Sequence, residues 1–208
     1  MRTPFTKYAV AGAAAVSLVA GGAVVAQAAL TKNPAEVTAG TYDLESSHGK
    51  ITWSVNHFGL STYTGQFVNV KAVLKLDPAN PSASTLTATI PLTDVAPNDD
   101  RLKAHLQTAD FFDTAKYPTA TFVSRSVTVD ADDANEATVV GDLTLKGVTK
   151  PVTIEVEFNQ AGAVRGAYKA GFDGEATIKR SEFGITFGDQ MGLGDDVKLH
   201  IEGEFIRQ

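Results

Sequence analysis

From about residue 40 onward, apolar and polar residues alternate with a period of two along most of the chain. Apolar side chains alternate with threonine and glutamate over residues 152–158, and the same alternation returns over residues 197–205. Successive side chains of a β-strand point to opposite faces, so each segment predicts a strand with one dry and one wet face. In an earlier segment the same phase places Trp53 on the dry face with Ile51 and Val55.

Eight such segments follow one another, with turn-forming residues between most of them. Two are joined by only a few residues around Gly147, which predicts an antiparallel hairpin. Eight amphipathic strands in up-and-down order can remove their edges by closing into a barrel, although a two-sheet sandwich has the same pattern. The predicted strands cover residues 50–57, 64–76, 84–91, 119–129, 137–146, 151–159, 167–179 and 196–206.

One helix is predicted between the third and fourth strands. Asn98 is a suitable N-cap, and Asp99 and Asp100 complement the positive end of the helix dipole. Pro118 then returns the chain to an extended conformation. One face of this helix carries Leu102, His105, Leu106 and Ala109.

The first residues of the chain have the pattern of a signal peptide. Two basic residues precede an uncharged stretch over residues 9–26, and Ala26-Gln27-Ala28 has the small-x-small pattern of a cleavage site. The alternative is an uncleaved membrane anchor, which the high content of Ala, Gly and Val disfavours. We expect a signal peptide over residues 1–28, a linker over residues 29–40, a folded domain over residues 41–208, and export of a soluble protein to the periplasm, cell envelope or extracellular space.

The net charge restricts the partners of this protein. It carries 18 basic and 24 acidic residues, for a formal charge of −6, and removing a leader with Arg2 and Lys7 makes the charge more negative. Nucleic acid is a poor partner for such a surface, and an anionic bilayer does not attract it. The chain has no cysteine, so a buried core must hold the exported domain together without disulfides.

Four strings of the sequence resemble one protein family. They are YDLESSHGKITWSVNHFGL (residues 42–60), HLQTADFFDTAKYPTATF (105–122), GDLTLKGVTKPV (141–152) and RSEFGI (180–185). In this order they resemble the YceI-like family of polyisoprenoid-binding proteins, over residues 41–205. The resemblance implies an all-β, eight-stranded antiparallel lipocalin-like barrel, in agreement with the strand count. It also implies an isoprenoid lipid of polyprenyl or isoprenoid-quinone type as the bound ligand, with no covalent cofactor.

Aromatic residues in or beside these strings are candidates for the ligand site. They lie at predicted strand ends or in the helical excursion, where they can line the entrance of an apolar tunnel; ordinary core packing is the alternative. Arg101 and Arg180 are candidates for a polar or phosphorylated head group, because a guanidinium donates to two oxygens at once, and surface salt bridges explain them nearly as well. The aromatic candidates are Phe58, Phe111, Phe112, Phe122, Phe183 and Phe187.

Two histidines carry the enzymatic alternative. The chain has no G-x-S-x-G or H-E-x-x-H motif, and its four histidines lack ligand spacing within one element, so we expect neither a bound metal nor catalytic residues. His57 and His105 fall inside the family-like strings. We expect both to form hydrogen bonds beside the barrel mouth at the ligand site, and a metal-binding or catalytic role is the alternative.

Three functions are compatible with the sequence. The first is a binding protein that holds an isoprenoid lipid for transport, storage or sequestration, with transient membrane contact. The second is an enzyme or metal protein that uses His57 and His105. The third is a barrel with a filled interior that acts as a protein-interaction module. The sequence leaves the oligomeric state open, a homodimer included.

Overall fold

The computed structural model describes residues 30–208. The predicted signal peptide, residues 1–28, lies outside the described residues. Among the described residues, no helix has the length and apolar character needed to cross a membrane.

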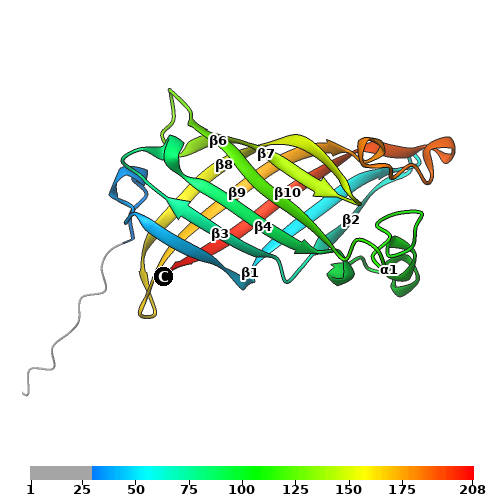
Figure 1. Ribbon diagram of the computed structural model, residues 1–208, viewed down its shortest axis with the longest axis horizontal. Helices are drawn as coiled ribbons and strands as arrows, with labels where there is room; N and C mark the ends of the chain where they lie inside the picture. The colour runs from blue at the N-terminus through cyan, green and yellow to red at the C-terminus, as the bar shows by residue number, and fades with distance from the viewer. Residues whose placement is uncertain (1–29) are drawn as a thin grey trace, which may run out of the picture.

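The described chain forms one antiparallel sheet that closes on itself (Figure 1). β10 pairs with β9 on one side and with β1 on the other, which closes the barrel. β2 and β3 together form one wall strand, and β4 continues into β5, so the barrel has eight strands as predicted. The strands are β1 (Gly40–His57), β2 (Ser61–Phe67), β3 (Lys71–Leu76), β4 (Thr85–Pro91), β5 (Val95–Ala96), β6 (Thr119–Val129), β7 (Glu136–Leu145), β8 (Val148–Val164), β9 (Ala167–Lys179) and β10 (Leu193–Arg207).

Two tight turns explain why consecutive strands are antiparallel neighbours. Lys146 and Gly147 connect β7 to β8 with φ values of 50° and 78°, and Arg165 and Gly166 connect β8 to β9 with 49° and 86°. Positive φ at both central residues of a two-residue loop matches the twist of the flanking strands. The hairpin predicted around Gly147 is confirmed.

The predicted helical excursion is α1 (Asp100–Leu106), between β5 and β6. Its N-cap is Asp99, whose side chain accepts a hydrogen bond from the backbone N–H of Leu102 at 2.9 Å, so the assignment to Asn98 was wrong by one residue. Three consecutive residues that can all cap a helix make this position ambiguous in the sequence. The 3-10 helices are η1 (Pro34–Glu36), η2 (Pro81–Ala83), η3 (Leu92–Asp94), η4 (Arg180–Phe183) and η5 (Asp189–Met191).

The segment expected to be a linker packs against the barrel instead. Thr31 pairs with Ala161, and Val37 is buried. The Tyr42 hydroxyl donates to the carbonyl of Thr38, and burial raises the pKa of Tyr42 to about 12. These contacts fix the N-terminal segment of the described chain across one end of the barrel.

β1 begins ten residues earlier than the alternation indicated. A bulge interrupts it, because Leu44 pairs with Phe205 whereas Gly49 pairs with Gly203. The intervening run from residue 45 to residue 48 is polar and has no alternation that marks a strand. Because of the bulge, the first half of β1 lacks a continuous period of two and was not predicted as a strand.

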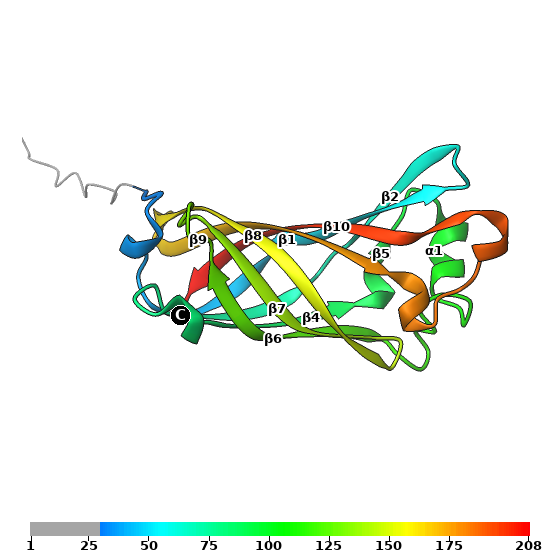
Figure 2. The ribbon, with the colours of Figure 1, turned by 90° about the horizontal axis from the view of Figure 1, so that it is seen from above.

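Two packed clusters share the interior: one reaches from the α1 end along the barrel to Val139 and Ile154, and the other lies at the η1 end. The α1-end core includes Trp53, Leu92, Leu106, Phe111 and Phe183. The η1-end core comprises Val37, Tyr42, Phe158, Ala161, Ala170 and Phe205. Figures 1 and 2 show α1 at one end of the long barrel and the C-terminus at the other. The predicted burial of Trp53 is confirmed, since it is 8% exposed.

Candidate functional site

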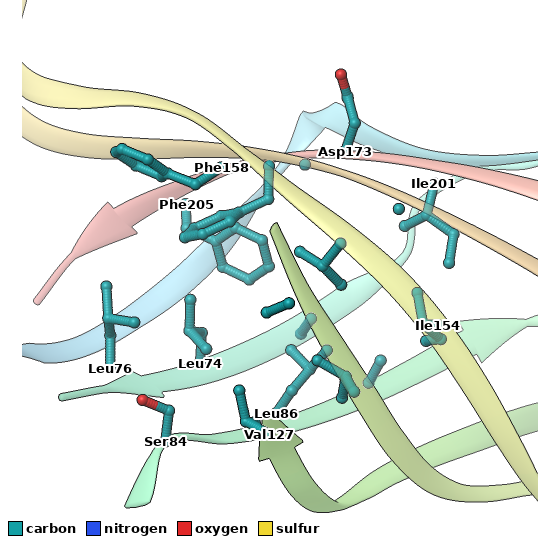
Figure 3. A pocket seen from close by; sticks show the side chains of 18 of the residues that line it. Leu74, Leu76, Ser84, Leu86, Val127, Ile154, Phe158, Asp173, Ile201 and Phe205 are labelled. Atoms are coloured by element: carbon teal, nitrogen blue, oxygen red, sulfur yellow. The ribbon is translucent and has the colours of Figure 1, made fainter. Parts of the chain in front are cut away.

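A cavity of about 360 Å³ lies inside the barrel, with members of both core clusters in its wall. This volume falls within the usual range of small-molecule pockets. Figure 3 shows aliphatic side chains from several strands around one common space, whereas Asp173 points away from it. Labelled lining residues are Leu74, Leu86, Val127, Ile154, Ile201 and Phe205.

Small residues at inward positions create this space. Ala72, Ala88, Gly174 and Ala176 all line the cavity. A Cβ atom at Gly174 would lie 3.1 Å from Cγ2 of Ile154 on the neighbouring strand β8, so even a methyl group there would press on that side chain. An eight-stranded barrel is only just wide enough for its own side chains, so a hollow requires small residues at some inward positions.

Polar groups in the cavity wall are few, and most already have partners. Nζ of Lys50 lies 2.8 Å from Oε2 of Glu202, and the Ser84 hydroxyl accepts a hydrogen bond from the N–H of Asp77 at 3.0 Å. Within the described chain, the buried Oδ1 of Asn135 has no hydrogen-bond partner. The cavity therefore offers mainly apolar contact, and its free polar atom is an acceptor.

Arg180 organises the opposite, α1 end. Its side chain is 5% exposed, and it is fully engaged by one carboxylate and four backbone carbonyls. The guanidinium donates at 2.6–3.0 Å to Asp189 Oδ1 and to the carbonyls of Ile185, Phe187, Leu193 and Gly194. Arg180 therefore holds η4, η5 and the start of β10 together.

Asp195 fixes the same segment from the other side. Its carboxylate accepts hydrogen bonds from the N–H and the hydroxyl of Ser181, both at 2.9 Å. Burial opposes ionisation of Asp195, but these hydrogen bonds and the nearby cations Lys179 and Arg180 lower its pKa overall. The η4 segment is thus held by a charged carboxylate as well as by a buried guanidinium.

An aromatic group closes the α1 end. The ring of His105 lies edge-on to Phe111 and Phe187, with centroids 5.0 and 4.8 Å apart, and its Nε2 lies 2.8 Å from Asp110 Oδ2. Phe183 is 1% exposed within the same core. None of these five residues lines the cavity.

The other sequence candidates are dispersed around the same end. Phe112 packs on Phe67 with ring centroids 5.6 Å apart, and His57 lies beside Phe58 at 4.1 Å. The side chain of Arg101 is 95% exposed. Of the ten residues selected from the sequence, Phe122 is the one that lines the cavity. A ligand role for the other nine stays a prediction.

The cavity residues themselves were not selected from the sequence. Leu74, Leu86, Ile154 and Leu199 occupy inward positions of strands whose alternation was recognised. The available signal was the phase of that alternation, which shows which side chains point inward. The candidates were instead chosen mainly among aromatic residues in or beside the family-like strings, so these aliphatic positions were not included.

One group of metal-competent side chains occurs in the described part of the chain, and it lies at the surface. It consists of Glu45, His48 and Glu204, and Lys169 donates hydrogen bonds to both carboxylates. The hydrogen bond from Lys169 lowers the pKa of Glu45, and the same bond raises the pKa of Lys169. The ammonium group already neutralises these oxygens, so we assign this group as an ion-pair network.

The closed sheet and its interior define a class of protein, the antiparallel barrel that encloses an apolar cavity. The profile of the YceI-like domain matches residues 42–205. Protein YceI of Escherichia coli is 39% identical over 167 residues, which cover 80% of this chain and 85% of that protein. The chain belongs to the YceI-like family, as its sequence strings predicted.

Solved structures show the same barrel. BcnA of Burkholderia cenocepacia superposes with a TM-score of 0.70 at 29% identity, covering 77% of this chain and 98% of that one. A polyisoprenoid binding domain from Saccharophagus degradans superposes with a TM-score of 0.59, covering 82% of this chain and 100% of that one. Its identity is 14%, so this second likeness concerns the fold alone.

Proposed function

We propose that this protein binds a long-chain isoprenoid lipid inside the barrel and carries or sequesters it outside the cytoplasm. The observation that supports the proposal most is the apolar cavity of about 360 Å³ in a member of the YceI-like family. A structural relative described as a polyisoprenoid binding domain supports the choice of ligand class. Export is supported by the leader-like pattern of residues 1–28.

The energetics favour binding without covalent chemistry. Each CH₂ removed from water contributes about 0.8 kcal/mol, so apolar contact can hold a chain of several isoprene units. A bilayer offers the same lipid a similar apolar environment, so exchange with a membrane is close to balanced. Head-group contacts and the fit of the chain then decide which side holds the lipid. This balance suits a carrier, and the proposal assigns no catalytic residue.

Of the ten residues selected from the sequence, we propose that Phe122 contacts the isoprenoid chain. Its ring lies against Gly141 of the neighbouring strand, where a Cβ atom would approach Phe122 Cζ to 2.4 Å. Gly141 therefore leaves room for this ring in the cavity wall. The aliphatic residues of the inward positions supply the remaining contacts.

Organic extraction of the purified protein, followed by mass spectrometry, tests the proposal. We expect an isoprenoid lipid in the wild type and its loss in Ala88→Phe, which fills the cavity from inside. The matched control is Val123→Phe on the adjacent strand, because Val123 is 49% exposed on the outer face. A wild-type protein that yields no isoprenoid, or an Ala88→Phe variant that retains it fully, would contradict the proposal.

A further inference from the structure

The barrel wall has an interrupted seam next to the cavity. β1 pairs with β3 as far as Asp43 and Val73, and it pairs with β2 from Ile51 and Phe67 onward. Between these pairs no β-bridge joins residues 44–50 to residues 68–72 in the described chain. The bulge of β1 lies at this point, so the two wall strands separate there.

A surface groove of about 390 Å³ lies over the seam. Its polar lining includes Asp43, Lys71, Thr87 and Thr89. Two residues, Leu44 and Ala72, line both this groove and the interior cavity. The groove and the cavity are therefore separated at this point by two apolar side chains and not by a continuous hydrogen-bonded sheet.

Leu44 fills a space that two glycines leave open. Gly49 and Gly203 are paired across β1 and β10, and a Cβ atom at Gly49 would lie 2.6 Å from Cδ2 of Leu44. At Gly203 the corresponding distance to Leu44 Cδ1 is 3.2 Å. Leu44 also packs against both core clusters, at their boundary. Leu44 is the larger of the two side chains that line both spaces, so a change of its rotamer is the movement that a passage between the groove and the cavity requires.

We propose that this seam is a lateral portal, closed by Leu44, through which the polar head group of the bound isoprenoid reaches the outer surface. The inference rests on the proposed function and adds the orientation of the ligand. The chain of the lipid lies in the cavity, and its head group lies in the groove beside Lys71. The head group is one rich in hydrogen-bond acceptors, such as a quinone carbonyl or a phosphate.

The distribution of donors and acceptors supports this orientation. The side chain of Lys71 forms no hydrogen bond or ion pair within the described residues, and the Thr87 and Thr89 hydroxyls can also donate. Asp43 balances the charge of Lys71 in the groove. In the cavity wall itself, the ammonium group of Lys50 is already paired with Glu202, and the buried atom without a partner, Oδ1 of Asn135, is an acceptor. An acceptor-rich head group therefore finds donors at the lateral groove.

Single cysteines can locate the head group, because the chain contains no cysteine of its own. Val73→Cys reports on the groove, Ala134→Cys on the end of the cavity, and Lys75→Cys is a control on the same strand as Val73 but outside both linings. Each variant is stripped of lipid and loaded with menaquinone, with geranylgeranyl monophosphate or with squalene, which has no head group. Retained ligand and the rate of thiol alkylation by a maleimide are measured on the same samples.

At a ligand concentration of about ten times Kd, most of the protein is occupied by mass action. We therefore expect the quinone or the phosphate to slow alkylation of Val73→Cys about tenfold. Alkylation of Lys75→Cys should not change, and squalene should protect neither position. If only one of these two ligands slows alkylation of Val73→Cys, its head group is the one that the groove recognises. Lys71→Gln should weaken retention of the protected ligand about fivefold, the scale of an exposed charged contact, and should leave squalene unaffected.

Two results would overturn the portal. If ligand is retained and Ala134→Cys is protected while Val73→Cys is not, the head group leaves through the end of the barrel and the proposed function stands. If squalene protects Val73→Cys equally, the groove does not recognise a head group. A wild-type protein that retains none of the three ligands contradicts the proposed function itself, and the portal with it.

Discussion

The two halves of the barrel interior differ in how they are filled. At the α1 end, aromatic rings pack against one another, and the buried Arg180 donates to five oxygens. Toward the η1 end, alanine, glycine, aliphatic residues and four phenylalanines surround a cavity. The α1-end half is closed by packed side chains and the other half contains the cavity, although the same eight strands run through both.

The comparison teaches that recognisable sequence strings and the candidate ligand site need not coincide. RSEFGI contains η4 at the packed end, and residues 105–112 form the last part of α1 and the segment that follows it. The cavity is formed by ordinary alternating strand positions. The family-like strings at this end therefore mark how the barrel is closed there, whereas only six of the residues that line the cavity fall within any of the four strings.

The largest expected effect concerns Arg180. Arg180→Leu should lower the free energy of unfolding by about 3–5 kcal/mol, because it leaves buried carbonyls and Asp189 without their donor. Urea melts measure this change. Arg101→Leu is the control, and we expect a change within about 0.5 kcal/mol because that side chain is 95% exposed. A loss below about 1 kcal/mol for Arg180→Leu would mean that the stability of the packed α1 end does not depend on this residue.

Trp53 gives the second test of the packed end. Trp53→Ala should cost about 3–5 kcal/mol in unfolding free energy, through lost burial and a new cavity. Its ring fills the space above Gly65, where a Cβ atom would lie 2.3 Å from Cζ2. Within the described chain the indole Nε1 has no hydrogen-bond partner, so Trp53→Phe should be much milder. Equal losses for the two variants in denaturant melts would show that burial of the ring is not the dominant contribution.

The same substitution outside and inside the cavity wall compares the two kinds of packing directly. Leu106 is 6% exposed in the α1-end core, and Leu106→Ala should cost about 3–5 kcal/mol. Leu199 lines the cavity, and Leu199→Ala should cost nearer to about 2 kcal/mol, because its side chain already borders empty space. Thermal and urea melts of the lipid-free protein provide both values. A larger loss for Leu199→Ala would reverse our assignment of the packed and hollow halves.

The smallest expected effect is a pH dependence of stability that comes from Asp195 at the packed α1 end. The pKa of Asp195 is lowered in the folded protein, so its contribution to stability is present above the ordinary aspartate pKa of about 3.9 and is lost as the pH falls through the lowered value. Asp195→Asn should therefore be less stable than the wild type at neutral pH, and this difference should shrink below about pH 4. Urea melts at several pH values test this, and a difference that grows on acidification would contradict the assignment.

The sequence predicted the architecture well because a period of two is a direct consequence of strand geometry. Residues 152–158 alternate cleanly and lie within β8, and the hairpin at Gly147 followed from a short connection. The first half of β1 was missed because its bulge breaks the period. The N-cap was misplaced by one residue because Asn98, Asp99 and Asp100 are all able to cap.

The cavity could not be predicted in the same way. Alternation shows that Leu199 and Ala176 point inward, but it does not show whether the space between them is filled. That depends on the summed volumes of inward side chains on all eight strands, which are far apart in the sequence. The role of Arg180 could not be predicted either, because its carbonyl partners come from the start of β10 and from the segment before it, whose backbone path the sequence does not reveal.

The measurement that tests the central claim most directly is the position of a bound isoprenoid relative to individual methyl groups. Intermolecular NOEs from a loaded, methyl-labelled sample would locate the chain of the lipid. Our account predicts NOEs to Ile154 and Leu199, which line the cavity, and none to Leu106 and Leu145, which belong to the α1-end core and do not line the cavity. NOEs to Leu106 and Leu145 without contacts to Ile154 and Leu199 would contradict the division of the barrel into a packed and a hollow half.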